Sequence, residues 1–158
     1  MDKIARLREL REGRSFQQEA ITEPEPAVKK TAAQKKQDAT EQWYKDRREE
    51  LTGFCTCGCG QKSSKDNDKR FKGSICHILS YRHFKSVATH PLNYIELAMF
   101  GGCHANFDDR SSDRWVNMEC WPTIRMRFLA IFPSISRKEY KHLPPVLLKV
   151  LEEEGISI

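Results

Sequence analysis

Two histidines, an asparagine and a carboxylate stand at intervals that could support hydrolytic chemistry. His77 lies in FKGSICHILS, Asn93 follows sixteen residues later, and His104 follows Asn93 by eleven residues in FGGCHANFDD. A neutral imidazole titrates near pH 6.5, so at neutral pH it can accept a proton from water. Asp108 stands four residues after His104, a spacing that puts both side chains on one face of a helix. The chain therefore holds a candidate proton acceptor and a candidate cation-binding pair.

Cysteines form a second group whose spacing suggests metal binding. Three of them lie within five residues in FCTCGCG (residues 54–60, here called the knuckle), too close together to pair easily with one another. Glycines beside them free the backbone to turn its amides toward thiolate sulfurs. Thiolate ligands of a structural zinc ion explain this pattern better than disulfides do. The expected ligands are four of the five residues Cys55, Cys57, Cys59, Cys76 and Cys103.

Composition and charge limit the classes of function. A chain of 158 residues allows one compact domain, and its 39% hydrophobic content is low enough that we expect part of the chain to lie outside the folded body. The net charge of +5 suits a polyanionic partner without establishing one. No window approaches the ~18 apolar residues of a membrane span, and the first residues lack the apolar core of a signal peptide. The expected location is the cytoplasm, where thiols stay reduced.

The elements that must position these residues are expected in three segments. Residues 1–39 are expected to form a flexible basic arm and linker. Residues 1–14 could form a short basic helix. Residues 21–38 are rich in Pro, Lys and Gln and poor in apolar groups, which predicts a disordered or loosely helical linker. A helix is predicted from Thr40, which could cap its start, to Gly53, with Trp43 and Tyr44 on one side. It opens the central domain, which covers residues 40–110.

Within the central domain, SICHIL predicts a strand, and YIELAMF together with CHANFDD predicts a helix whose start is undefined. Residues 111–158 are expected to add a helical extension that packs on the central domain. In this extension Ser136 and Glu139 form a capping-box pattern, and Gly155 predicts a helix end. Cys120 is interpreted as a small buried hydrophobic residue, and Trp115 as part of the core.

The order His77, Asn93, His104 resembles that of the HNH endonuclease family. The resemblance covers roughly residues 54–109 and is carried by ICHIL, HPLNYIEL and GGCHANFD. The same stretch is similar to HNH-type proteins of bacterial viruses and prophages. The resemblance implies an α+β fold: a small ββα-metal (His-Me finger) core with a zinc knuckle, flanked by helices. In such a core a hairpin carries the first histidine, a loop the asparagine, and a helix the last histidine.

The resemblance also implies a function, that of a metal-dependent DNA endonuclease hydrolysing phosphodiester bonds, here phage or prophage encoded and acting in the host cytoplasm. By position, His77 would be the general base, and Asn93 would bond the backbone of the loop so that His77 points at the phosphate. His104 and Asp108 would bind the catalytic cation, which could be Mg²⁺, Mn²⁺ or Zn²⁺.

The sequence departs from the family pattern at the cysteines. Many HNH enzymes carry a metal-binding Asp or His just before the general base, where this chain has Cys76, and a thiolate suits zinc better than magnesium. Cys76 therefore binds either the catalytic cation or the structural zinc. Family members with structural zinc usually have two cysteine pairs, and the second is here reduced to Cys103. The favoured zinc ligands are Cys59, Cys76 and Cys103 with either Cys55 or Cys57.

Basic residues bracket the proposed base. Residues 62–85 contain seven Lys or Arg and two Asp, a net charge of +5. Phosphate contacts are expected from Lys69, Arg70, Lys72, Arg82 and Lys85. The remaining histidines, His83, His90 and His142, are interpreted as loop or surface residues, with the alternative that His90 or His83 supplies a missing ligand of the cation site.

Two alternatives to the nuclease remain. One is a non-catalytic nucleic-acid-binding module that has lost its cation site. The other is a zinc-stabilised phage accessory protein whose N-terminal arm recruits a protein partner. The sequence does not indicate an oligomeric state.

Overall fold

A computed structural model describes residues 30–99, 102–108 and 113–158 of the chain. The predicted basic arm lies outside the described residues up to residue 29. Residues Thr31–Ile158 form one compact unit, so the central domain and the C-terminal extension fold together. No helix within the described ranges is long and apolar enough to cross a membrane.

Helix α2 (Ala32–Glu50) begins well before the predicted start at Thr40. The Thr31 side chain accepts a hydrogen bond from the Gln34 backbone, and the Gln34 side chain accepts one from the Thr31 backbone, which makes a capping box. The Thr40 hydroxyl instead donates to the Lys36 carbonyl within the helix. Residues 32–39 are therefore helical, the second of the two states predicted for the linker, and they continue directly into the predicted helix.

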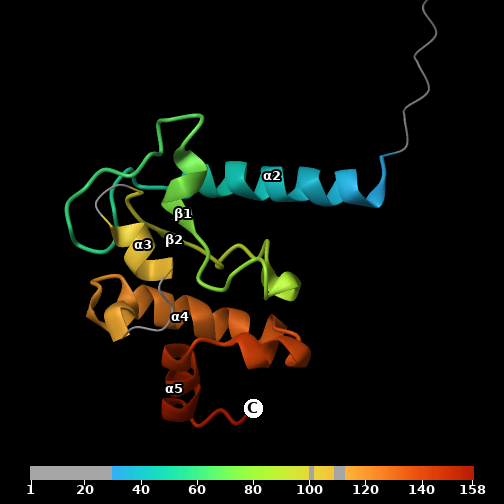
Figure 1. Ribbon diagram of the computed structural model, residues 1–158, viewed down its shortest axis with the longest axis vertical. Helices are drawn as coiled ribbons and strands as arrows, with labels where there is room; N and C mark the ends of the chain where they lie inside the picture. Colours follow the sequence, from blue (N-terminus) through green and yellow to red (C-terminus); the bar gives the residue numbers. More distant parts are fainter. Residues whose placement is uncertain (1–29, 100–101, 109–112) are drawn as a thin grey trace, which may run out of the picture. The chain divides into compact units, whose positions relative to one another are not determined.

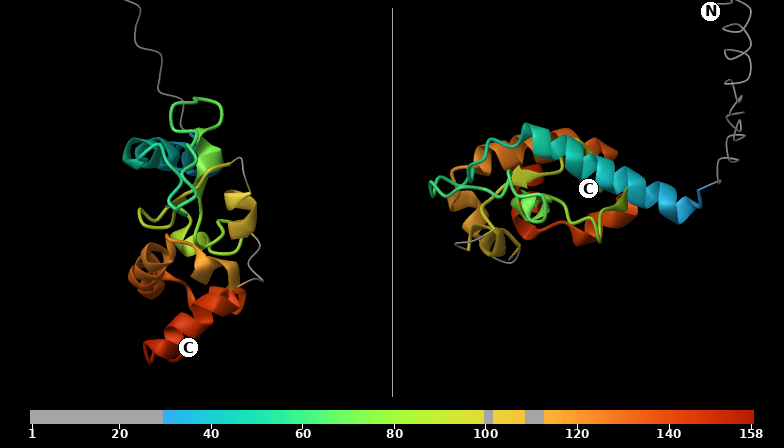
Figure 2. Two further views of the ribbon diagram at one scale, coloured as in Figure 1. Left: turned by 90° about the vertical axis from the view of Figure 1, so that its left-hand side faces the viewer. Right: turned by 90° about the horizontal axis from the view of Figure 1, so that it is seen from above.

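A two-stranded antiparallel sheet follows α2 in the chain. Strand β1 (Ile75–Cys76) pairs with β2 (Ile95–Glu96), with Ile75 opposite Glu96 and Cys76 opposite Ile95. The sheet lies between α2 on one side and α4 (Trp121–Ile131) on the other (Figures 1 and 2). The strand predicted in SICHIL is thus present but short, because a 3₁₀ helix, η1 (Phe71–Ser74), occupies the residues before it.

Helix α3 (Cys103–Asp108) comes after the sheet, so the elements follow the order β1, β2, α3 in an α+β fold. The prediction of a helix in YIELAMF was wrong, because Ile95 and Glu96 are strand residues and the Leu97 amide donates to the Ser74 carbonyl next to β1. Between the strands, the long connection from residue 77 to residue 94 contains only one short 3₁₀ helix, η2 (Lys85–Val87).

The C-terminal extension packs on this connection through one buried cluster. The extension consists of helices α4 and α5 (Pro145–Glu153) and three 3₁₀ helices, η3 (Asp113–Asn117), η4 (Phe132–Ser134) and η5 (Arg137–His142). The cluster joins residues of both parts, among them Leu79, Phe84, Trp115, Cys120, Ile124 and Phe128. Burial of Trp115 and Cys120 confirms their prediction as core residues. Gly155, with a φ of 68°, follows α5 as predicted.

The capping box predicted at Ser136 and Glu139 is incomplete. Ser136 precedes η5 but makes no side-chain capping hydrogen bond. The Glu139 carboxylate, 5% exposed, instead accepts hydrogen bonds from the backbone and the hydroxyl of Ser86. The Ser136 backbone also donates to this carboxylate, so one half of the predicted box is present and the half made by the Ser136 hydroxyl is missing.

Candidate metal centre and active site

Four cysteines bring their sulfur atoms together from two parts of the chain. The Sγ atoms of Cys55, Cys57, Cys59 and Cys103 all lie within 4.8 Å of one another. The Sγ–Sγ distance is 3.2 Å between Cys55 and Cys57, 3.3 Å between Cys57 and Cys103, and 3.5 Å between Cys59 and Cys103. A tetrahedral zinc ion with Zn–S bonds of about 2.3 Å holds its sulfur ligands roughly 3.8 Å apart. Within the described ranges this is the one group of three or more such ligands so close together, and it could hold a metal ion such as zinc.

The backbone of the knuckle explains how three of these thiols come together. Phe54 and Lys62 form an antiparallel bridge, and the Cys55 amide donates to the Gln61 carbonyl at 2.8 Å, which closes a tight hairpin. Gly58 and Gly60 turn this hairpin with φ values of 88° and 70°. Residues with a Cβ rarely adopt this left-handed region, so the glycines allow a turn that packs the thiols side by side.

Within the cluster, the thiols differ in acidity. A hydrogen bond from the backbone of Gln61 is the main cause that lowers the pKa of Cys59 to about 7. Burial is the main cause that raises the pKa of Cys103 to about 11 and that of Cys57 further still. Metals bind the thiolate form, so Cys59 is more readily available than Cys57 or Cys103 to start metal binding at neutral pH.

Cys76 is not one of the four clustered cysteines, although the favoured ligand set included it. It lies on β1 with 2% of its surface exposed, and it lines a separate cavity. Burial, followed by the negative charge of Asp108, raises the pKa of its thiol. The cluster thus uses both Cys55 and Cys57, and Cys76 belongs to the second site.

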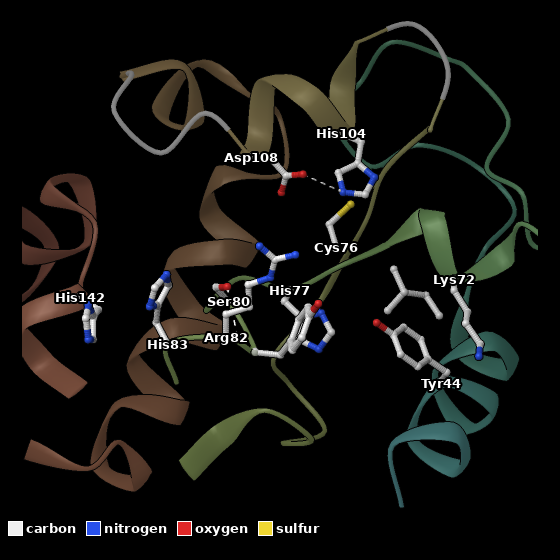
Figure 3. A pocket seen from close by; sticks show the side chains of 12 residues that line it. Tyr44, Lys72, Cys76, His77, Ser80, Arg82, His83, His104, Asp108 and His142 are labelled. Carbon is white, nitrogen blue, oxygen red and sulfur yellow. Dashed lines mark hydrogen bonds and ion pairs between the residues drawn. The ribbon is translucent and has the colours of Figure 1, made fainter. Parts of the chain in front are cut away.

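That second site is a cavity of about 640 Å³, here called the histidine cavity. Figure 3 shows the two histidines singled out in the sequence around this opening, with the sulfur of Cys76 projecting toward the side chains of α3. The charged, metal-binding or proton-accepting side chains that line it include Lys72, Cys76, His77, Arg82, His104 and Asp108. Residues from η1, β1, the connection and α3 therefore meet around one cavity. They are far apart in the sequence, and the sequence alone does not show that they meet.

His104 and Asp108 are arranged as a pair on α3. His104 Nδ1 lies 2.7 Å from the Gly73 carbonyl oxygen, which requires the ring to donate there. His104 Nε2 lies 3.2 Å from Asp108 Oδ2. With the proton of a neutral ring on Nδ1, the Nε2 lone pair faces the carboxylate side and is available to a cation. The spacing of four residues on one helix accounts for the pairing.

His77 packs among aromatic rings. Its imidazole stacks on the indole of Trp43, with centroids 4.7 Å apart and planes at 21°. The ring of Tyr44 meets the imidazole edge-on, with centroids 6.0 Å apart. The ring of Tyr81, four residues after His77 in the chain, lies with its centroid 5.6 Å from that of the imidazole. The Trp43 Nε1–H also donates to the His90 carbonyl. The aromatic pair in α2 was visible in the sequence, but nothing local indicated that it would support His77.

Asn93 is fully buried and ties the connection together. Its Nδ2 donates to the carbonyls of Leu79 and Val87, both at 3.0 Å, and its Oδ1 accepts from the Leu79 amide at 2.8 Å. The three bonds fix the segment that starts two residues after His77. This is the backbone bonding that the family resemblance implies for Asn93, while its part in catalysis stays a prediction.

The five predicted phosphate contacts are distributed unevenly. Lys72 and Arg82 line the histidine cavity, and Lys72 also pairs with Glu41 at 2.7 Å. Lys85 lies with its Nζ 5.5 Å from the ring of Tyr81, which lines the cavity as well. Lys69 and Arg70 are exposed in the loop before η1 and do not line the cavity.

Two further histidines line the cavity: His83, which sequence reasoning considered only as an alternative ligand, and His142, which it missed. The rings of His83 and His142 stack with centroids 4.7 Å apart and planes at 30°. They had been interpreted as loop and surface residues, and no signal in the sequence links them. Only the packing of the extension on the connection brings them together.

Comparison of this chain with protein-family models, curated proteins and solved structures finds no match. Function is therefore inferred from the chemistry and geometry of these two sites.

Proposed function

We propose that this protein is a metal-dependent DNA endonuclease with an HNH-type ββα-metal core, which is stabilised by a structural zinc ion bound to the four clustered cysteines. The observation that carries the proposal is that His77 and His104 line one cavity together with Cys76 and Asp108. These side chains come from β1, the residue after it and α3, the elements that would carry them in such a core.

The order of elements supports the proposed core. β1 leads directly into His77, the connection ends near Asn93, β2 follows, and α3 carries His104 as its second residue. The hydrogen bonds of Asn93 to Leu79 and Val87 hold the connection that begins at His77. A fixed connection would aim the imidazole of His77 into the cavity with little loss of conformational entropy during the reaction.

In the proposed reaction, His77 acts as the general base. Its ring accepts a proton from a water molecule, whose oxygen bonds to the phosphorus while the bond to the leaving oxygen breaks and that oxygen takes up a proton. The stack with Trp43 restricts the rotation of the imidazole. A cation bound by His104 Nε2, the Asp108 carboxylate and Cys76 Sγ would supply charge neutralisation at the phosphate and the leaving oxygen.

The charges around the cavity fit a nucleic acid better than a neutral substrate. Among the residues that the structure describes, Lys72, Arg82 and four histidines line it, against one carboxylate, that of Asp108. Arg82 is exposed and can bind phosphate oxygens through its planar guanidinium. DNA binding should then weaken steeply as salt rises, because each phosphate contact releases counterions.

Nicking of supercoiled plasmid by the purified full chain tests the proposal. Cleavage is expected with at least one of Mg²⁺, Mn²⁺ and Zn²⁺, and replacing His77 with Ala is expected to slow it by about 10²- to 10⁴-fold, the usual contribution of a general base. The matched control is His90→Ala, since His90 does not line the cavity. A His77→Ala protein that cuts as fast as the parent would remove the proposed role.

A non-catalytic nucleic-acid-binding module is the second candidate, and Cys76 favours it. Its thiol is buried and its pKa is raised, so a neutral thiol stands where a charged ligand of a hard cation would be needed. Salt-dependent DNA binding with no cleavage under any of the three cations would support this candidate over the nuclease.

A further inference from the structure

The stacked pair His83–His142 has no part in the mechanism above. His83 lies in the connection between the strands, and His142 is the last residue of η5. Both side chains are exposed, and both line the histidine cavity. In Figure 3 they occupy the end of the cavity opposite Tyr44 and Lys72, with His77 and Arg82 between the two ends.

Packing around the pair holds it in place. The buried Glu139 of η5 accepts hydrogen bonds from the backbone and hydroxyl of Ser86, and the Ser136 amide donates to the same hydroxyl at 3.1 Å. The ring of the fully buried Phe84 meets His142 edge-on, with centroids 6.4 Å apart. These contacts lock the extension to the segment that carries His83, so the two imidazoles are presented to the cavity by a rigid support.

Such a pair has the chemistry of an anion site. Each neutral imidazole offers one ring N–H donor, and each imidazolium offers two. Arg82, the neighbour of His83 in sequence, lines the same cavity and adds a permanent positive charge. No carboxylate lines this end of the cavity among the described residues, because Asp108 stands beside His104.

We propose that His83, His142 and Arg82 form a second phosphate subsite, which binds a phosphate of the DNA other than the one that is cleaved. The inference rests on the proposed function, because it assumes that the scissile phosphate lies between His77 and His104. A polynucleotide presents phosphates at regular intervals. The second cluster of donors at one end of the open cavity could therefore bind a phosphate that neighbours the scissile one along the strand. The C-terminal extension is then part of the DNA-binding surface, through His142.

The test measures DNA binding by fluorescence anisotropy with the full chain and no added divalent cation, so that no cleavage occurs. A short labelled duplex is used in which one phosphate at a time is replaced by a neutral methylphosphonate. For the parent protein, neutralising the phosphate at the subsite is expected to weaken binding by about 10-fold, the loss typical of a hydrogen bond to a charged group. His83→Asn and His142→Asn each leave Arg82 and one imidazole in the subsite, so the same replacement is expected to weaken binding clearly less than in the parent, while replacement of the scissile phosphate weakens binding as much as in the parent.

His90→Asn is the matched control, because it makes the same change to a histidine that does not line the cavity. Its methylphosphonate profile should equal that of the parent. Thermal melts show whether the variants remain folded, and two single variants on different segments keep the test decisive if one of them unfolds.

The outcomes separate this inference from the proposed function. A parent protein that binds and cuts DNA, with variants whose methylphosphonate profiles match the parent's, overturns the subsite and leaves the nuclease intact. A parent protein without DNA affinity overturns both. Reduced sensitivity at a single non-scissile phosphate in the two variants supports the subsite, because a merely structural defect would weaken binding at every position alike.

Discussion

The indole of Trp43 stacks on the imidazole of His77, with 4.7 Å between ring centroids and 21° between planes. Trp43 belongs to α2 and is 5% exposed, while His77 follows β1 directly. The same indole donates through Nε1 to the carbonyl of His90, near the end of the connection. One side chain of α2 thus supports both the imidazole and the backbone that surrounds it, so the leading helix is part of the candidate site.

Replacing Trp43 with Leu should therefore slow plasmid nicking by about 10-fold, since misplacing a reacting group costs at least that much. Trp43→Phe keeps a ring for stacking but loses the Nε1–H, and should fall between the parent and Trp43→Leu. The measurement is the nicking rate against pH, because a changed environment of His77, which must be deprotonated to act as a base, should move the acidic limb of the profile, whereas simple loss of folded protein scales the whole curve. An unmoved profile with an unchanged rate contradicts the positioning role.

The four clustered cysteines should bind one zinc ion per chain. Mass spectrometry of metal content is expected to find zinc in the parent protein and in Cys76→Ser, and none in Cys57→Ser. Loss of zinc should lower the melting temperature sharply, because structural zinc contributes on the order of 10 kcal/mol in small domains. Cys76→Ser is the informative control, since Cys76 lines the other site. Loss of zinc from Cys76→Ser would restore Cys76 to the ligand set.

Cys76→Asp should change the preferred cation of the nuclease. A thiolate ligand favours zinc, whereas a carboxylate suits Mg²⁺ and Mn²⁺. The ratio of nicking rates in Mg²⁺ and Zn²⁺ is expected to rise by at least about 10-fold in this variant. Cys76→Ser serves as the control, because it removes the thiol without adding a carboxylate. An unaltered ratio would place Cys76 outside the cation site.

Asn93→Ala should destabilise the fold. It leaves the Leu79 amide and the carbonyls of Leu79 and Val87 without their buried partner. Each buried group left unpaired costs about 1–3 kcal/mol, so the free energy of unfolding is expected to fall by roughly 3 kcal/mol. Urea denaturation measures this change. A loss below about 1 kcal/mol would mean that the connection does not depend on this amide.

The contact between Glu139 and Ser86 should make stability depend on pH. Burial opposes ionisation of Glu139, but hydrogen bonds from the hydroxyl and backbone of Ser86 outweigh it and lower the pKa of the carboxyl below its usual 4.5. A lowered pKa in the folded state stabilises the protein above pH 4.5, and this contribution is lost as the pH falls through the folded-state pKa.

Glu139→Gln cannot ionise, so between pH 6 and pH 3 its unfolding free energy should fall less steeply than that of the parent. Urea denaturation at both pH values gives the two slopes. Glu152→Gln, a change at an exposed glutamate of α5, should keep the slope of the parent. Equal slopes for Glu139→Gln and the parent would contradict the assignment.

The sequence by itself determined the features that depend on near neighbours. The knuckle could be recognised because three thiols and two glycines within seven residues leave few alternatives to a turn that gathers sulfur. The pairing of His104 with Asp108 follows from helical spacing, and the burial of Trp115 from its size and apolar character.

Tertiary structure decided the rest. It excluded Cys76 from the cluster, because β1 directs that side chain to the histidine cavity and α3 brings Cys103 to the knuckle instead. It also joined Trp43 to His77 and His83 to His142. Contacts of this kind depend on how separate elements pack, and no local spacing or propensity encodes which side chains will then face each other.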